Sequence, residues 1–355
     1  MTERTEGRIE GRIEDVARAM VADGRGILAA DESTGTIEKR FQSIGVANEE
    51  ANRRDYREML FRTSDAMREC ISGVILFEET LTQRAKDGTP FVELLREVDS
   101  IPGIKVDQGA KPAADLGGQT DTAGLDGLPD RLARYHDEGA RFAKWRAVLS
   151  IDDTLPSVDA IEANARGLAA YARACQNASI VPIVEPEVLM DGNPGDHTLQ
   201  RCEEVTRAVL KGVFEALRDE GVAMEGMILK PNMVIDGSRR RGANAASVEE
   251  VAEATVRVLK DCVPAGVPGV AFLSGGQTEV EATAHLNAMV AGFDTPFALT
   301  FSYGRALQAA ALKAWGGKAE NVAAGSRAFA HRARMNHLAA LGRWNEAMER
   351  EVEAA

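Results

Sequence analysis

The segment Glu225-Gly-Met-Ile-Leu-Lys-Pro-Asn-Met233 combines a short apolar run with a lysine at its end. A run of this length, bounded by glycine and proline, is typical of a buried strand in a parallel sheet. Lys230 can be interpreted in two ways. Loss of hydration in an apolar interior favours a neutral amine, which condenses with carbonyl groups to form a Schiff base. Alternatively, the side chain packs its methylene groups and extends its ammonium group to water. The segment alone leaves both interpretations open.

Seven further apolar runs of the same kind occur along the chain, so that the predicted strands cover residues 26–30, 73–77, 103–106, 142–149, 181–188, 226–229, 269–273 and 297–301. Between most of them apolar residues recur at three- and four-residue spacing, for example over 158–174, 199–217, 248–259 and 279–290. Alternating strands and helices imply a parallel sheet, and eight such units close into a (β/α)8 TIM barrel. An open doubly wound sheet fits less well, because no Gly-x-Gly-x-x-Gly motif follows an early strand.

The 355 residues are predicted to form a single α/β domain, because no linker rich in proline or serine divides them. The barrel is expected over about residues 26–316. Apolar positions Ile13, Val16, Ala17 and Met20 predict an additional helix before it. A charged, alanine-rich stretch at 321–351 predicts one or two helices in a C-terminal tail of about residues 317–355. Residues 115–128, rich in glycine, threonine and aspartate, are predicted to form a loop.

Composition excludes several classes of protein. Apolar residues make up 45% and charged residues 27%, which is enough for a large core. The net charge of −13 argues against a nucleic-acid or anionic-membrane partner, since phosphate contacts need a basic surface. No apolar signal segment or membrane-spanning run is present, and the four cysteines lack paired spacing. We therefore expect a cytoplasmic protein with reduced thiols.

The active site of such a barrel lies at the C-terminal ends of its strands, where this sequence places charges of both signs. These residues are Asp31, Lys105, Asp107, Lys144, Arg146, Glu185, Glu187 and Lys230. Alternating positions within a strand put them on one face, and buried charges are costly unless they are paired. The set could instead be a buried ion-pair network, with Lys105 and Asp107 as a plain pair. Asp31 with Ser33 and Thr34 also resembles a helix N-cap.

Two glycine-containing loops follow the seventh and eighth strands, namely Ser274-Gly275-Gly276-Gln277 and Ser302-Tyr303-Gly304-Arg305. Barrels bind phosphate at these two loops through backbone N–H groups and a helix start, although ordinary turn chemistry is the alternative. Arg305 would add a forked cationic group. The five histidines show no ligand spacing, so we expect neither a metal nor another cofactor.

Taken together, these stretches resemble class I fructose-bisphosphate aldolases, the metal-independent family that forms a Schiff base. The resemblance runs almost the length of the chain and rests on the motifs at residues 26–35, 73–77, 103–107, 142–146, 181–187, 229–233, 272–277 and 299–305. It implies that Lys230 is the Schiff-base lysine, that Glu185 is the acid/base for the carbinolamine, and that Asp31 lies beside the bond that breaks. Lys144 and Glu187 complete the charged centre. The family's sites for the two phosphates are matched by two sets of residues: Ser274, Gly275, Ser302 and Arg305 for the ketose 1-phosphate; Ser33, Thr36, Arg40, Lys105 and Arg146 for the remainder of the sugar and its 6-phosphate.

The resemblance further implies reversible cleavage of fructose 1,6-bisphosphate in glycolysis or gluconeogenesis, and a homotetramer. One departure concerns the C-terminus. Animal members end in a tyrosine that assists proton exchange, whereas this chain ends Glu351-Val-Glu-Ala-Ala355, so enamine protonation is expected to be slower or to use another group. Two alternatives stay open: a Schiff-base aldolase for sedoheptulose bisphosphate or fructose 1-phosphate, and a barrel that serves as a binding or scaffolding protein.

Overall fold

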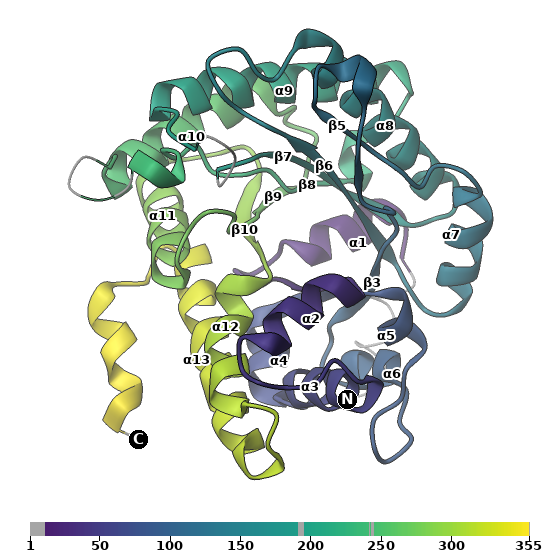
Figure 1. Ribbon diagram of the computed structural model, residues 1–355, viewed down its shortest axis with the longest axis vertical. Helices are drawn as coiled ribbons and strands as arrows, with labels where there is room; N and C mark the ends of the chain where they lie inside the picture. Colours follow the sequence, from purple (N-terminus) through teal and green to yellow (C-terminus); the bar gives the residue numbers. More distant parts are fainter. Residues whose placement is uncertain (1–10, 191–194, 241, 243–244, 355) are drawn as a thin grey trace.

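The computed structural model describes residues 11–190, 195–240, 242 and 245–354, and its central feature is a closed parallel barrel (Figure 1). The order of strands around the barrel is β1-β10-β9-β8-β7-β6-β3-β2. The bounds are β1 (Gly26–Ala30), β2 (Ile71–Leu76), β3 (Ile101–Lys105), β6 (Phe142–Leu149), β7 (Val181–Val188), β8 (Ile228–Leu229), β9 (Gly269–Phe272) and β10 (Ala298–Tyr303). The predicted (β/α)8 fold is confirmed.

Helices surround the barrel (Figure 1). They are α1 (Ile13–Met20), α2 (Thr34–Gln42), α3 (Glu50–Phe61), α4 (Ser64–Cys70), α5 (Glu78–Thr82), α6 (Phe91–Glu97), α7 (Leu128–Asp137), α8 (Val158–Asn177), α9 (Leu199–Asp219), α10 (Val248–Cys262), α11 (Glu279–Gly292), α12 (Arg305–Trp315) and α13 (Val322–Ala340). Local sequence sets the starts of α10 and α11, because Ser247 with Glu250, and Thr278 with Glu281, form reciprocal capping boxes. None of the helices among the described residues is both long and apolar enough to span a membrane.

The inside of the barrel is apolar at one end and charged at the other. Ile27, Ile101, Phe142, Val181 and Ile228 join residues of α1 in one buried cluster, so α1 covers the N-terminal end of the barrel. Because side chains alternate along a strand, the residues two and four positions further on return to the same inner face. These later positions carry the charged groups of the site.

The predicted loop at 115–128 overlaps a small hairpin that the prediction missed and that begins before residue 115. β4 (Ala110–Pro112) and β5 (Thr120–Thr122) pair antiparallel, and the 3₁₀ turn η2 (Ala114–Leu116) lies between them. Thr120 Oγ1 donates to the carbonyl of Val148 at 2.9 Å, and Thr122 Oγ1 donates to the carbonyl of Arg146 at 2.9 Å. This hairpin is anchored on β6 by polar contacts rather than by an apolar pattern, which is why periodicity did not reveal it.

The C-terminal segment forms helices outside the barrel, as predicted. α13 packs against α11 and α12, and the 3₁₀ segment η6 (Glu346–Ala354) follows it. Glu349 accepts hydrogen bonds from Trp344 Nε1 at 3.0 Å and lies 3.1 Å from His331 Nε2. In Figure 1 this yellow end of the chain lies at the outer edge of the molecule.

Candidate active site

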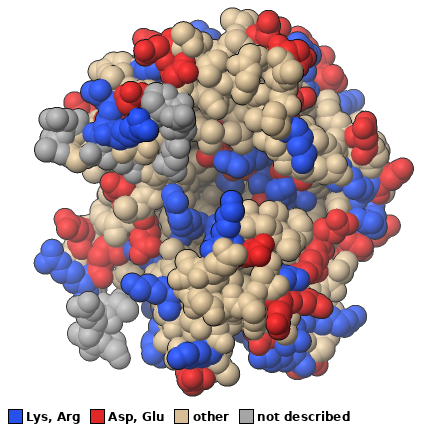
Figure 2. Space-filling view, in the orientation of Figure 1, with Lys and Arg blue, Asp and Glu red and all other residues tan. Residues whose placement is uncertain are grey.

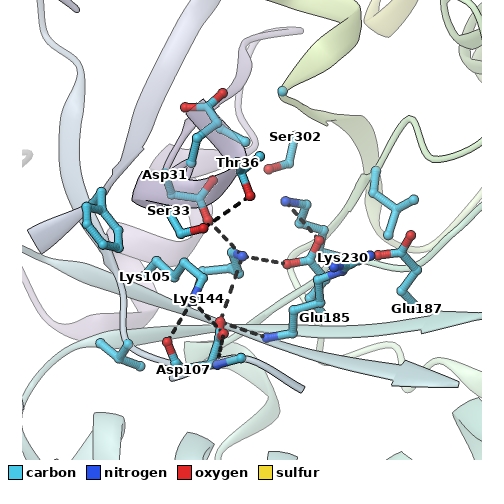
Figure 3. Close-up of a pocket in the computed structure, with 18 of the residues that line it drawn as sticks. Asp31, Ser33, Thr36, Lys105, Asp107, Lys144, Glu185, Glu187, Lys230 and Ser302 are labelled. Atoms are coloured by element: carbon cyan, nitrogen blue, oxygen red, sulfur yellow. Dashed lines mark hydrogen bonds and ion pairs between the residues drawn. The ribbon is translucent and has the colours of Figure 1, made fainter. Parts of the chain in front are cut away.

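Lys230 lies inside the barrel, immediately after β8, and only 3% of its surface is exposed. Its backbone N–H donates to the carbonyl of Val184 at 2.8 Å, so the residue stays in register with β7 although β8 ends one residue earlier. Ile228 belongs to the inner cluster, and Lys230 is two positions further along. The amine therefore points into the barrel interior, as Figure 3 shows.

Glu185 lies between two lysines. Its Oε1 is 3.1 Å from Lys230 Nζ, and its Oε2 is 3.2 Å from Lys144 Nζ. The side chains of all three residues are at most 5% exposed. A carboxyl group this close to an amine can exchange protons with it or with an adduct formed on it.

Lys144 joins Glu185 to Asp31, because its Nζ is also 2.8 Å from Asp31 Oδ2 (Figure 3). Burial alone would lower the pKa of Lys144, but Asp31, Glu185 and Asp107 outweigh burial and hold that pKa well above its ordinary value. Burial alone would raise the pKa of Asp31, but Lys144, Lys230 and Lys105 hold it well below its ordinary value. At neutral pH this centre therefore contains a charged ammonium beside an ionised carboxylate.

Two further ion pairs flank the centre. Arg146 Nε donates to Glu187 Oε2, and the pKa of Arg146 is raised because this carboxylate outweighs the effect of burial. Lys105 Nζ donates to Asp107 through both the side-chain Oδ1 and the backbone carbonyl, each at 2.6 Å. The Arg146 side chain is 41% exposed, so it lies at the rim of the site, where it can meet a ligand that enters from solvent.

The two glycine-containing loops contribute to the same cavity. Ser274, Gly275, Ser302 and Gly304 line it, and Ser302 Oγ is buried without a hydrogen-bond partner among the described residues. α12 begins at Arg305, directly after Gly304, which has no side chain to cap the helix. A helix N-terminus presents unpaired N–H groups and the positive end of the helix dipole, which favours an anion.

Both glycines of the Ser274 loop have a steric role. A Cβ atom at Gly275 would lie 2.8 Å from Leu273 Cδ1 and 3.0 Å from Glu187 Oε1, so the ends of these two side chains would have to shift to make room for it. Gly276 has a φ of 72°, in the left-handed region that favours glycine. The turn therefore depends on glycine at position 276, whereas a larger residue at position 275 would displace Leu273 and Glu187.

The residues around the start of α2 form another wall. Ser33 occupies the N-cap position of α2, and its Oγ lies 3.1 Å from Thr36 Oγ1 (Figure 3). Arg40, one turn further along, lines the main cavity and also a hollow that it shares with Ser274, Gly275 and Arg305. The structure thus places Arg40 beside the two glycine loops. Ser33 holds the N-cap position of α2, but its side chain makes no capping hydrogen bond there.

The cavity that these residues enclose has a volume of about 670 Å³. In Figure 2 lysine and arginine side chains gather in and around the central hollow, although the whole chain carries a net charge of −13. A cluster of cations in a recess attracts anionic ligands more strongly than the net charge of the protein suggests.

Residues 12–355 match the family model described as class-I fructose-bisphosphate aldolase. The chain belongs to this family. The class-I aldolases most similar to it include a probable fructose-bisphosphate aldolase class 1 of Xanthomonas campestris, 52% identical over 94% of this chain and 98% of the relative. Fructose-bisphosphate aldolase C of Rattus norvegicus is 53% identical over 94% of this chain and 90% of its own length. Cytosolic fructose-bisphosphate aldolase 6 of Arabidopsis thaliana is 54% identical over 90% of this chain and 87% of its own length.

A solved structure agrees with this assignment. The fructose-bisphosphate aldolase of Plasmodium falciparum, crystallised with TRAP and a small-molecule inhibitor, superimposes with a TM-score of 0.90. The two chains are 47% identical, and the match covers 94% of this chain and 95% of the other. The family resemblance drawn from the sequence motifs is therefore confirmed, and this aldolase is a lyase.

The sequence did not single out Glu32 and Arg57, which lie at or beside the site of this aldolase, and Asp107 has contacts beyond the pair predicted for it. Asp107, read from sequence as a possible plain pair with Lys105, also accepts from the backbone N–H of Gly109 at 3.1 Å and lies 3.9 Å from Lys144 Nζ. Glu32 and Arg57 form a buried ion pair beneath α2. A charged residue directly after Asp31 was the available signal for Glu32, whereas nothing in the local pattern around Arg57 marks it.

The described part of this aldolase contains no group of three or more histidine, cysteine, aspartate or glutamate residues placed to hold a metal ion. The acidic side chains of the site are bonded instead to lysine and arginine.

Proposed function

We propose that this aldolase cleaves fructose 1,6-bisphosphate reversibly to dihydroxyacetone phosphate and glyceraldehyde 3-phosphate through a Schiff base on Lys230. The observation that carries the proposal is the position of the Lys230 amine, which is buried and 3.1 Å from the carboxyl group of Glu185. The membership of the chain in the class-I family supports the same chemistry.

Formation of the Schiff base uses the Lys230–Glu185 pair. The neutral amine attacks C2 of the open-chain sugar, giving a carbinolamine whose hydroxyl leaves as water when Glu185 supplies a proton. The product is an iminium ion between C2 and Lys230 Nζ. Lys144, held in its charged form beside Glu185, stabilises negative charge that develops there.

Cleavage then uses Asp31. Its carboxylate takes the proton of the C4 hydroxyl, the C3–C4 bond breaks, and the electron pair of that bond moves through C2 to the iminium nitrogen. Glyceraldehyde 3-phosphate leaves, and an enamine remains on Lys230. Protonation at C3 regenerates the iminium ion, and its hydrolysis releases dihydroxyacetone phosphate. The depressed pKa of Asp31 keeps its carboxylate in the ionised form at neutral pH, which is the form that can take the proton.

The two phosphates would bind to different sets of residues. Ser302 Oγ, the backbone of Gly275 and Gly304, and Arg305 suit the 1-phosphate, since they lie beside the helix start of α12. The resemblance grouped Arg40 with the 6-phosphate residues, but Arg40 shares a hollow with Ser274 and Arg305 and its Nη2 lies on the side of Gly304, so we assign it to the 1-phosphate. The list for the 6-phosphate and the adjoining carbons is Ser33, Thr36, Lys105 and Arg146. A threonine hydroxyl at position 36 supplies the same donor as a serine would.

The test is borohydride reduction with fructose 1,6-bisphosphate or dihydroxyacetone phosphate, with and without a chelator, followed by peptide mass spectrometry. We expect an adduct on Lys230 that the chelator does not affect. Lys230→Met should abolish both the adduct and turnover while the fold is retained, and Lys211→Met, an exposed position on α9, should retain both. Substantial cleavage by Lys230→Met, or trapping on another lysine, would contradict the assignment.

We also propose a homotetramer located in the cytoplasm. The family resemblance supports the assembly, and the similarity to a relative named cytosolic supports the location. Light scattering should give a mass about four times the 38.1 kDa of the chain, and a mass equal to one or two chains would contradict the tetramer.

A further inference from the structure

A buried polar network lies beneath the wall of the cavity that carries Arg40. At its centre is Glu32, the residue after Asp31, whose side chain is only 4% exposed. Glu32 Oε2 accepts from Arg57 Nη2 of α3, and Oε1 accepts from Arg40 Nη1 of α2 and from Gln308 Nε2 of α12 at 3.0 Å. One carboxylate thus holds two guanidinium groups and an amide from three different helices.

Gln308 closes the network. Its Nε2 also donates to the carbonyl of Ala29 in β1 at 2.7 Å, and its Oε1 accepts from Tyr56 OH at 3.1 Å and Arg57 Nη1 at 3.3 Å. Gln308, Tyr56 and Arg57 are all at most 3% exposed. Satisfied networks of buried polar groups are rigid, because each member is costly to expose or to leave without its partner.

Arg40 carries this rigidity to the ligand cavity. Its side chain is 25% exposed and lines the hollow shared with Ser274 and Arg305. While Nη1 is bonded to Glu32, Nη2 lies on the side of Gly304, 3.6 Å from the position that a Cβ atom would take there. The single negative charge of Glu32 is matched by Arg57, so the network presents one net positive charge, on Arg40.

We propose that Glu32 is a positioning residue for substrate binding, which holds Arg40 by one nitrogen so that the other faces the ketose 1-phosphate. Glu32 does not touch the substrate in this proposal and acts through Arg40. An unrestrained arginine would sample many rotamers and would lose part of its binding energy in becoming ordered. The inference rests on the proposed function, because it requires a phosphate at this end of the cavity.

The variant Glu32→Gln separates positioning from simple electrostatics, because the two predict opposite signs. Removing a negative charge near an anion site should strengthen phosphate binding if charge alone matters. If Glu32 positions Arg40, binding should weaken, since Arg40 and Arg57 donate to different carboxylate oxygens and glutamine replaces one of these oxygens by an NH2 group that cannot accept. We expect KM for fructose 1,6-bisphosphate to rise about tenfold or more, the loss typical of one charge-assisted hydrogen bond, with a much smaller change in kcat.

The experiment measures KM and kcat for fructose 1,6-bisphosphate and fructose 1-phosphate in the unmodified protein and in five variants: Glu32→Gln, Arg40→Ala, the double variant that combines them, Glu32→Asp and Glu79→Gln. Glu32→Gln is made in the natural background and in an Arg40→Ala background, where it should add no further change to KM. Glu32→Asp keeps the charge opposite Arg57 but withdraws the carboxylate by one methylene group, so it serves where Glu32→Gln does not fold and should shift KM in the same direction. Glu79→Gln is the matched control, since Glu79 holds Arg53 of α3 through two hydrogen bonds, at 2.6 and 2.8 Å.

A rise in KM for both substrates that disappears in the Arg40→Ala background supports the proposal. An unchanged or lower KM would overturn it, and so would an equal rise in the Arg40→Ala background or in Glu79→Gln, because the effect would then be a general one on the fold. Borohydride trapping on Lys230 is measured in the same samples. Its loss in the unmodified protein would count against the proposed function, whereas trapping with an unaltered KM would count against the role of Glu32 alone.

Discussion

Replacing Lys144 by methionine tests whether burial, rather than distance, gives the central ion pairs their strength. Lys144 Nζ lies 2.8 Å from Asp31 Oδ2, and the two side chains are 5% and 13% exposed. Lys86 Nζ lies at the same distance from Asp55 Oδ2, but its side chain is 57% exposed. Methionine keeps a similar length and removes only the charge, so Lys144→Met and Lys86→Met form a matched pair.

The expected costs differ because the environments differ. With an effective dielectric constant of about 20, two unit charges at this distance attract by about 6 kcal/mol. Removing one partner of a buried pair typically destabilises a protein by about 3–5 kcal/mol, since the other charge stays buried. The destabilisation should come mainly from the unpaired charge of Asp31, because Glu185 still has Lys230 as an ion-pair partner and Asp107 still has Lys105. For the exposed pair of Lys86 the cost should be about 0–1 kcal/mol.

Urea unfolding of the two variants beside the unmodified protein measures these costs. A second readout is the pH dependence of kcat. In Lys144→Met the fall of kcat on the acid side should occur at a higher pH than in the unmodified protein. The reason is that the Asp31 carboxylate loses its nearest positive charge, which raises its pKa. Equal destabilisation by both variants would refute the argument from burial. An acid limb that stays in place while kcat falls would refute the role given to Asp31.

Two further predictions concern stability. The pKa values of Asp31 and Glu32 are lowered in the folded protein, so the stability they contribute should be complete above their ordinary values of 3.8 and 4.5 and should be lost as the pH falls below them. Urea unfolding at a series of acidic pH values checks this, and a constant free energy of unfolding down to about pH 3 would contradict it. Gly103→Ala should destabilise the barrel, because the added Cβ atom would overlap the ring of Phe142, whereas Gly167→Ala, in an open position on α8, should stabilise it by about 0.5–1 kcal/mol. Thermal unfolding compares the two, and similar shifts in Tm would show that the space beside Phe142 is not limiting.

Much of the architecture was predictable because it depends on local periodicity. The predicted strands at 26–30, 142–149 and 181–188 coincide with β1, β6 and β7. The exceptions are elements that tertiary contacts create. β8 is reduced to two residues because η3 (Met224–Gly226) takes up the start of the predicted run. The β4–β5 hairpin is polar and depends on hydrogen bonds to β6.

The candidate site divides in the same way. Alternation within a strand was enough to predict that Lys144 with Arg146, and Glu185 with Glu187, face the interior, since the two-residue period of a strand is a property of the backbone. Which carboxylate meets which lysine depends on the register between strands, and the position of Glu185 between Lys144 and Lys230 appears only in the assembled barrel.

The sequence by itself therefore determined the strands, the charges at their C-terminal ends, the glycine loops and, through those motifs, the family. Only the tertiary structure decided the partners of those charges and the network around Glu32. Glu32 bonds to Gln308 across 276 positions of the chain and to Arg57 across 25. No local pattern encodes such contacts, because they arise where closure of the barrel brings helices from the beginning and the end of the chain together. A buried charge is stable only where that packing supplies its partners.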